Sequence, residues 1–116
     1  MTPGKLSTKC GRIVVNPCLR TSNAWDRMRG LLFRDAPQAG AGLLIDPCSS
    51  VHTFAMSYPI DVVYLNRDFQ VVKTITKLNP WRVSACKTAS MTLELAGGQA
   101  DSLELVPTLE LQWQGA

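Results

Sequence analysis

Hydrophobic residues near the start of the chain recur with the period of an amphipathic helix. Trp25, Met28 and Leu32 lie at positions i, i+3 and i+7, so their side chains share one face of a helix. Asn23, like the two residues before it, is of a type that caps helix N-termini. The pattern therefore predicts one short amphipathic helix over residues 22–33.

After a turn-rich connection, the apolar segments become short and alternating, as in a β protein. The predicted strands cover residues 12–15, 42–45, 51–54, 60–66, 70–78, 91–96 and 108–113. The sequence Asn-Arg-Asp-Phe over residues 66–69 is typical of a hairpin turn, which predicts antiparallel pairing of the strands on either side. Residues 1–11 contain Pro3, Gly4 and Gly11 and are expected to form a loose N-terminal arm.

Two of these segments differ in the number of their apolar faces. Residues 60–65 (IDVVYL) are apolar on both faces, so this strand is expected to be buried on both sides. In residues 90–96 (SMTLELA), a methionine and two leucines alternate with Ser90, Thr92 and Glu94, which predicts one buried and one solvent-exposed face. We expect the whole chain to form one domain of mainly β (α+β) class: a small barrel-like or rolled antiparallel sheet with the helix covering one opening.

Composition narrows the class of protein. The chain has 116 residues, of which 46% are hydrophobic and 18% are charged, so it should fold around its own core. The net charge is only +3, and the basic residues are spread from Lys5 to Lys87 without a long run, which argues against a nucleic-acid-binding surface. No stretch reads as a signal peptide or a membrane span. We therefore expect a cytoplasmic monomer without membrane contacts.

The cysteine pattern gives no sign of a structural metal or of disulfides. Cys10, Cys18, Cys48 and Cys86 are widely spaced and form no Cys-x-x-Cys or Cys/His cluster. The chain also has no second histidine that could join His52 in holding a metal. We expect reduced thiols, no metal site and no cofactor.

One segment, VHTFAMSYPIDVVYLN (residues 51–66), contains the only histidine and, shortly after it, an aspartate among apolar residues. An ionised carboxylate in such a strand is expensive to desolvate unless it is paired or fully hydrogen-bonded. His52, the helix arginines or backbone N–H groups could supply its partners. Two interpretations of Asp61 stay open. Either it caps residues 59–60 or anchors the helix through Arg29 or Arg34, or it is an acid or ligand acceptor that lines a pocket.

Other candidate ligand contacts lie near this pair in the sequence. His52, Phe54 and Met56 alternate along one strand face, and Trp81 in a proline-containing loop can stack on a planar ligand. Each of them also has an ordinary interpretation as a core residue or loop anchor. The main hypothesis is a module that binds a small ligand or a partner in a cleft between the helix and these strands. The candidate ligand-binding residues are His52, Asp61, Arg34, Arg29, Phe54, Met56 and Trp81.

Two other classes of function fit the same residues. A hydrolase or thiol-dependent enzyme would use His52 with Asp61 or with Cys48, although the chain has no Gly-x-Ser-x-Gly nucleophile elbow. A structural accessory subunit of a larger assembly would instead show an exposed apolar patch after folding.

Five motifs along the chain form a set: RMRGLLFR (27–34), AGLLID (41–46), VHTFAMSYPIDVVYLNRDFQVV (51–72), LNPWR (78–82) and LELAGG (93–98). Together they resemble an uncharacterised bacterial and archaeal family, domain of unknown function 192. The resemblance implies a compact, largely β fold with a short helix, and it names no reaction. It also implies that the motif positions form one spatial cluster, namely Arg27, Gly30, Phe33, Arg34, His52, Phe54, Met56, Pro59, Ile60 and Asp61.

Overall fold

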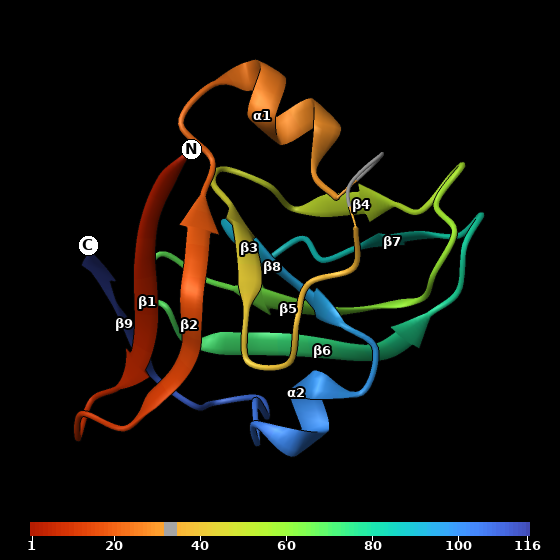
Figure 1. Cartoon of the computed structure of the whole chain (residues 1–116). Coiled ribbons are helices and arrows are strands. Elements are labelled where there is room, and N and C mark those ends of the chain that lie inside the picture. The colour runs from red at the N-terminus through yellow and green to blue at the C-terminus, as the bar shows by residue number, and fades with distance from the viewer. Residues whose placement is uncertain (32–34) are drawn as a thin grey trace.

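The structure is a computed structural model that describes residues 1–31 and 35–116 of the chain (Figure 1). In chain order its elements are β1 (Thr2–Thr8), β2 (Ile13–Arg20), α1 (Ala24–Arg29), β3 (Gly42–Ile45), β4 (Ser50–His52), β5 (Ile60–Leu65), β6 (Val71–Leu78), β7 (Val83–Ala85), β8 (Met91–Ala96), α2 (Gln99–Ser102) and β9 (Leu111–Gly115). In this part of the chain, neither helix is long and apolar enough to span a membrane.

Seven strands form one rolled sheet in the order β6-β5-β8-β3-β2-β1-β9, while β4 and β7 form a separate pair. Neighbours in the large sheet are antiparallel except β2 and β3, which are parallel. The predicted mainly β, α+β fold with a rolled sheet is confirmed. The purely antiparallel pairing was wrong, because the crossover that carries α1 returns the chain to run along β2 in the same direction.

The two edges of the sheet meet at one end without closing it into a barrel. At the start of β6, the backbone N–H of Val71 donates to the carbonyl of Leu109 at 2.8 Å, and Gln70 bridges to Glu110 just before β9. Along the rest of their described length, β6 and β9 do not pair with each other. The sheet is therefore open, and a closed barrel is not confirmed.

The first residues of the chain form a strand and not the loose arm that we expected. β1 pairs with β2 on one side and with β9 on the other, and Leu6, Ser7 and Thr8 are buried. Gly4, which suggests a loop in the sequence, instead lets β9 pass close by, since a Cβ atom there would collide with the Gln114 carbonyl. Sheet pairing on both sides thus overrides the local loop signals.

The predicted hairpin between two strands is confirmed. β5 and β6 pair antiparallel, and the turn between them begins at Asn66. The side-chain oxygen of Asn66 accepts hydrogen bonds from the backbone N–H groups of Asp68 and Gln70, both at 3.0 Å.

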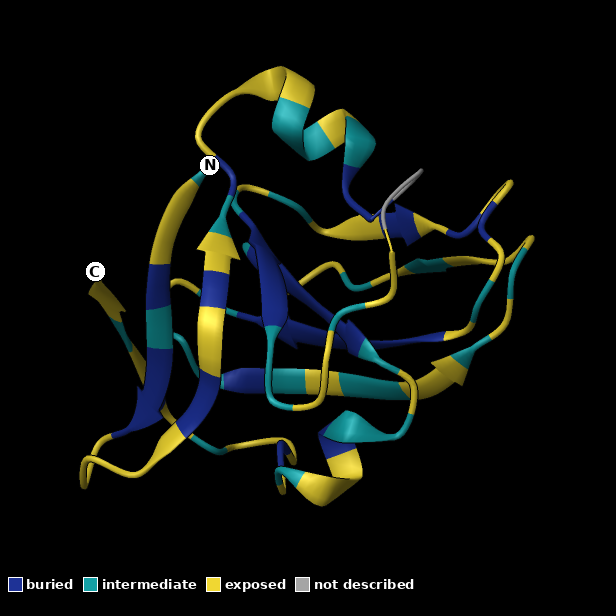
Figure 2. Ribbon diagram, viewed as in Figure 1, coloured by how far each residue is buried: buried dark blue, intermediate teal, exposed yellow. Residues whose placement is uncertain are grey.

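Hydrophobic residues pack on both faces of the sheet, and β5 contributes to both, as its sequence predicts. Val63 and Leu65 belong to an inner cluster that draws on all seven strands, and Ala100 of α2 completes it at one opening of the roll. Val62 and Tyr64 belong to an outer cluster, which lies on the other face of the sheet. Figure 2 shows the continuous burial of β3, β5 and β8 at the centre.

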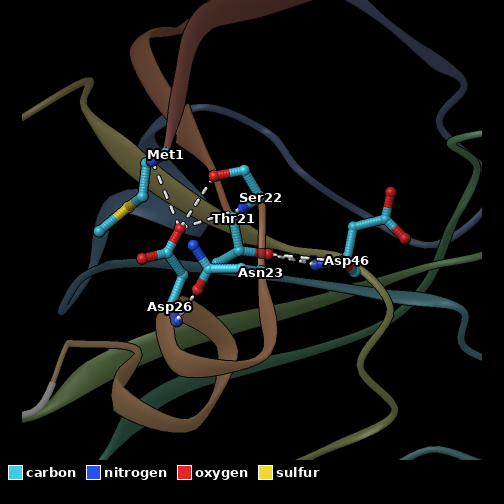
Figure 3. Close-up of polar contacts among 6 residues, drawn as sticks. All are labelled: Met1, Thr21, Ser22, Asn23, Asp26 and Asp46. Atoms are coloured by element: carbon cyan, nitrogen blue, oxygen red, sulfur yellow. Dashed lines mark hydrogen bonds and ion pairs between the residues drawn. The ribbon is translucent and has the colours of Figure 1, made fainter.

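Helix α1 is shorter than predicted and carries no buried residue. Trp25 and Met28 of the predicted apolar face are 70% and 73% exposed, so the amphipathic interpretation was wrong; Leu32 lies outside the described residues. Polar contacts hold the helix instead (Figure 3). Asn23 accepts a hydrogen bond from the Asp26 N–H at 2.9 Å, and the Asp26 carboxylate lies 3.3 Å from the N-terminal amine.

Candidate functional site

Asp61 is fully buried in β5, and its carboxylate is saturated by backbone donors. It accepts hydrogen bonds from the N–H groups of Lys77 at 2.8 Å, Gly98 at 2.9 Å and Ala100 at 2.7 Å. These bonds join β5 to the end of β6 and to the first turn of α2. The geometry fits a structural role for Asp61, but the carboxylate anchors β6 and α2 through backbone N–H groups, whereas we expected it to cap residues 59–60 or to anchor the first helix.

His52 lies at the end of β4 and is exposed, whereas Asp61 is fully buried in β5. Its ring lies 5.1 Å from that of Phe54, which in turn stacks on Trp81 with ring centroids 5.9 Å apart. The structure therefore does not pair His52 with Asp61. It places His52 in an exposed row of three rings.

Thr53 fixes this row by tying two segments together. The buried Thr53 hydroxyl donates to the carbonyl of Asn79 at 2.6 Å and accepts from the Arg82 N–H at 2.9 Å. Its backbone N–H donates to the Arg82 carbonyl at 2.9 Å, and its carbonyl accepts from the Trp81 N–H at the same distance. The hydroxyl also lies 3.3 Å from the Arg82 carbonyl, so five hydrogen bonds to one residue hold the loop that presents Trp81.

A small pocket of about 70 Å³ lies between the end of α1 and β4. It is lined by Arg27, Met28, Arg29, Gly30, Leu31, Ile45, Cys48, Ser50, Val51, His52, Phe54, Met56 and Glu94. Four of the predicted ligand-binding residues, Arg29, His52, Phe54 and Met56, therefore meet at one place. Asp61 and Trp81 do not line this pocket, and Arg34 lies outside the described residues.

Glu94 of β8 is the residue of this pocket that the sequence did not single out. Its side chain is on the outer face of the sheet, and the residue is only 3% exposed. Among the described residues, Oε1 of Glu94 has no hydrogen-bond partner. Gly30 comes so close that a Cβ atom there would lie 3.0 Å from this oxygen. We call this pocket, with its buried acceptor, the Glu94 pocket.

Burial also changes the acidity of Glu94. Desolvation raises the pKa of its carboxyl to about 7, against the opposing effect of a hydrogen bond from the Leu31 backbone N–H. The carboxyl therefore exchanges a proton near neutral pH and still has an oxygen that can accept a hydrogen bond. In the part of the chain described, no three His, Cys, Asp or Glu side chains gather as metal ligands would.

The prediction that one face of β8 is exposed to solvent was wrong, and this explains why Glu94 was missed. Alternation in the sequence shows that Glu94 lies opposite the leucines, but it does not show what covers that side. In the structure, β4 and the segment after α1 cover it, at Val51 and Leu31. The only available signal was the quoted LELAGG motif, which gave Glu94 no role.

Cys48 is the cysteine whose position best fits the hypothesis of a thiol-dependent enzyme. It lines the Glu94 pocket together with His52, and its Sγ donates to the Ser50 carbonyl at 3.0 Å. Cys18 is different, because burial in the inner cluster raises the pKa of its thiol to about 12.

A larger cleft of about 630 Å³ is also lined by Cys48, and two of its charged residues, Arg20 and Asp46, are paired with each other. The guanidinium of Arg20 forms an ion pair with Asp46 and lies 5.6 Å from the ring centre of Phe69 and 5.4 Å from that of Trp113. Arg20 thus ties β2 to the β5–β6 hairpin and to β9. We interpret this cleft as a structural junction.

Comparisons with known proteins agree with this fold and add no activity. The model of the domain of unknown function 192 family (DUF192), described as an uncharacterized ACR, matches residues 18–113. A protein of unknown function from Novosphingobium aromaticivorans DSM 12444 is 20% identical, with a TM-score of 0.76 over 96% of this chain and 84% of that chain. A "putative transcription regulator" from Sinorhizobium meliloti 1021 is 19% identical, with a TM-score of 0.81 over 97% of this chain and 92% of that chain. No curated protein matches the chain.

Proposed function

This chain belongs to the family domain of unknown function 192, and from that premise we propose that it is a binding module whose Glu94 pocket receives a hydrogen-bond donor of a small ligand or of a partner. The single observation that carries the proposal is the buried, unpartnered Oε1 of Glu94. Leaving such an acceptor unpaired costs about 1–3 kcal/mol, which a bound donor would recover. Native structures keep few such atoms, and a ligand site is one reason to keep one.

The rest of the pocket suits such a ligand. Val51 and Met56 are buried apolar residues of the wall, and they shield the carboxyl from bulk solvent. Arg29 and His52 line the same pocket and supply polar groups that can orient a ligand. This arrangement keeps the ligand site of the sequence-based hypothesis but exchanges its acceptor, from Asp61 to Glu94.

The test is a fragment screen by NMR on ¹⁵N-labelled protein, with small amines, amides and alcohols as the probes. We expect fragments with a donor group to shift the amide signals of Gly30, Leu31 and Ile45. Glu94→Met removes both acceptor oxygens at similar side-chain volume and should abolish these shifts, whereas Glu110→Met, at an exposed position, should keep them. The proposal fails if no fragment binds at these amides, or if Glu94→Met binds the same fragments equally well.

A second candidate is an enzyme, because two observations favour acid–base or thiol chemistry in the same pocket. The pKa of Glu94, near 7, suits a general acid or base. His52 and Cys48 line the same pocket, whereas Asp61 is occupied by backbone donors. A thiol-reactive probe distinguishes the thiol version: Cys48 would then react faster than Cys86, which is similarly half-buried, and equal labelling of the two would contradict it.

A further inference from the structure

Three exposed apolar side chains lie at or beside the mouth of the Glu94 pocket. Met28 is 73% exposed, Phe54 43% and Trp81 64%. Met28 and Phe54 line the pocket itself, and Trp81 stacks on Phe54. We call these three residues the apolar rim. Large side chains exposed together in this way mark interaction surfaces, and aromatic residues supply much of the binding energy in protein interfaces.

The size of the pocket indicates what kind of ligand needs this rim. Its volume is about 70 Å³, whereas pockets for free small molecules usually measure about 300–1,000 Å³. Only a handful of heavy atoms fit inside, and even the best small ligands gain at most about 1.5 kcal/mol per atom. A tight ligand must therefore make most of its contacts outside the pocket, as a protein segment lying on the apolar rim would.

The chemistry of the pocket indicates which side chain enters it. Oε1 of Glu94 needs a donor, and an ammonium group supplies one together with the opposite charge. An ammonium is compact, whereas a guanidinium is a wide planar fork that fits such a small space poorly. Arg27 also lines the pocket and carries a positive charge, so the partner segment should carry acidic residues beside its cationic one.

Resting on the proposed function, we propose that the occupant of the Glu94 pocket is a lysine side chain of a partner protein, whose flanking acidic segment packs on the apolar rim. The rim is already held in place for this role. Thr53 binds the loop of Trp81 through hydrogen bonds to residues 79–82, so little ordering is needed on binding. This would make the protein an accessory subunit that captures a linear segment.

The experiment is selection of binders from a phage library of random peptides. We expect the selected peptides to share a lysine with neighbouring acidic residues. Replacing that lysine by norleucine in a synthetic peptide should weaken binding at least about tenfold. Trp81→Ala, an exposed position that should not disturb folding, and Glu94→Met should each weaken it similarly. Val106→Ala, which removes an exposed apolar residue outside the rim, serves as the control and should not.

n-Butylammonium serves as the probe of the pocket alone and separates this inference from the proposed function. If it shifts the amides of Gly30 and Leu31 in the wild type but not in Glu94→Met, while no peptide is selected, the pocket binds donors and the partner inference is overturned. If neither probe binds, both proposals are overturned. Selected peptides that tolerate norleucine overturn the lysine, and peptides that tolerate Trp81→Ala overturn the rim.

Discussion

Two buried carboxyl groups of this molecule differ in how many hydrogen bonds they accept. Asp61 accepts three backbone hydrogen bonds, whereas Oε1 of Glu94 accepts none among the described residues. In the sequence, Asp61 lies in a strand that is apolar on both faces, whereas Glu94 lies on the polar face of an alternating strand. Asp61 was therefore interpreted as a buried carboxylate and Glu94 as an exposed one. Only the tertiary partners show that both are buried, and only they distinguish an anchor from an open acceptor.

Asp61→Asn should destabilise the protein without changing the Glu94 pocket. The amide would present its NH₂ to a site built from N–H donors, so at least one buried bond is lost, at about 2–4 kcal/mol. Urea unfolding gives the free energy, and hydrogen exchange at Gly98 and Ala100 should accelerate. Asp68→Asn, at an exposed position in the hairpin turn, is the matched control and should be neutral. Equal stabilities of the two variants would contradict the anchor role.

Glu94 should make stability depend on pH. Its pKa is about 7 in the folded protein and about 4.3 in the unfolded chain, so the folded state holds the proton more tightly between these values. The resulting stabilisation is full below about pH 4 and is lost as the pH rises through about 7, for a total of about 3–4 kcal/mol.

The measurement is urea unfolding of the wild type and of Glu94→Gln between about pH 4 and about pH 8. The wild type should lose about 3 kcal/mol relative to the variant, because the glutamine does not titrate. Glu110→Gln, at an exposed glutamate, should follow the wild type. Parallel pH profiles of the wild type and Glu94→Gln would show that Glu94 is not desolvated.

At the scale of elements, the sequence predicts the central strands β3, β5, β6 and β8 well, but it missed β1 and gave only the first part of β2. Residues 42–45 and 91–96 match β3 and β8 at both ends. The short β7 and α2 were missed, because they carry almost no periodic signal. The backbone of α2 depends on Asp61, a contact that no local pattern contains. Similarly, the cover over β8, which turns Glu94 into a pocket residue, is a tertiary feature.

The loop that presents Trp81 gives the test at this scale. Thr53→Val removes the hydroxyl that bonds to Asn79 and Arg82, at nearly constant volume, and leaves their backbone groups unpaired. We expect a loss of about 2 kcal/mol in the free energy of unfolding and faster motion of Trp81, read from its fluorescence anisotropy in a variant with the other tryptophans replaced by Phe. Thr76→Val on the exposed side of β6 should change neither quantity. An unchanged Trp81 anisotropy in Thr53→Val would contradict the rigid rim.

For the molecule as a whole, the roll of the sheet creates both the core and the site. The inner face of β8 packs in the inner cluster, and its outer face carries Glu94 under β4. The pocket combines three stretches of the chain, around residues 27–31, 45–56 and 94. A single sequence shows each stretch but not their convergence, so Arg29, His52, Phe54 and Met56 were named as candidates without the carboxyl that they surround.

Thiol labelling reports on the integrity of the roll. Cys18 is buried in the inner cluster, and burial raises its pKa to about 12. Cys10 is exposed, and a hydrogen bond with the Thr8 hydroxyl lowers its pKa. A thiol reagent should therefore modify Cys10 first and Cys18 only as the whole sheet unfolds in urea, as peptide mass spectrometry would show. Rapid labelling of Cys18 without denaturant would contradict the closed inner cluster.

The most direct test of the role of Glu94 is the titration of its own carboxyl, followed through the ¹³Cδ chemical shift with and without n-butylammonium. We expect an apparent pKa near 7 in the free protein, which falls when the ammonium binds, because the cation stabilises the charged carboxylate. A Glu94 pKa near the reference value of about 4.3, or one that does not change when the amine is added, would contradict a buried carboxyl with an open acceptor site.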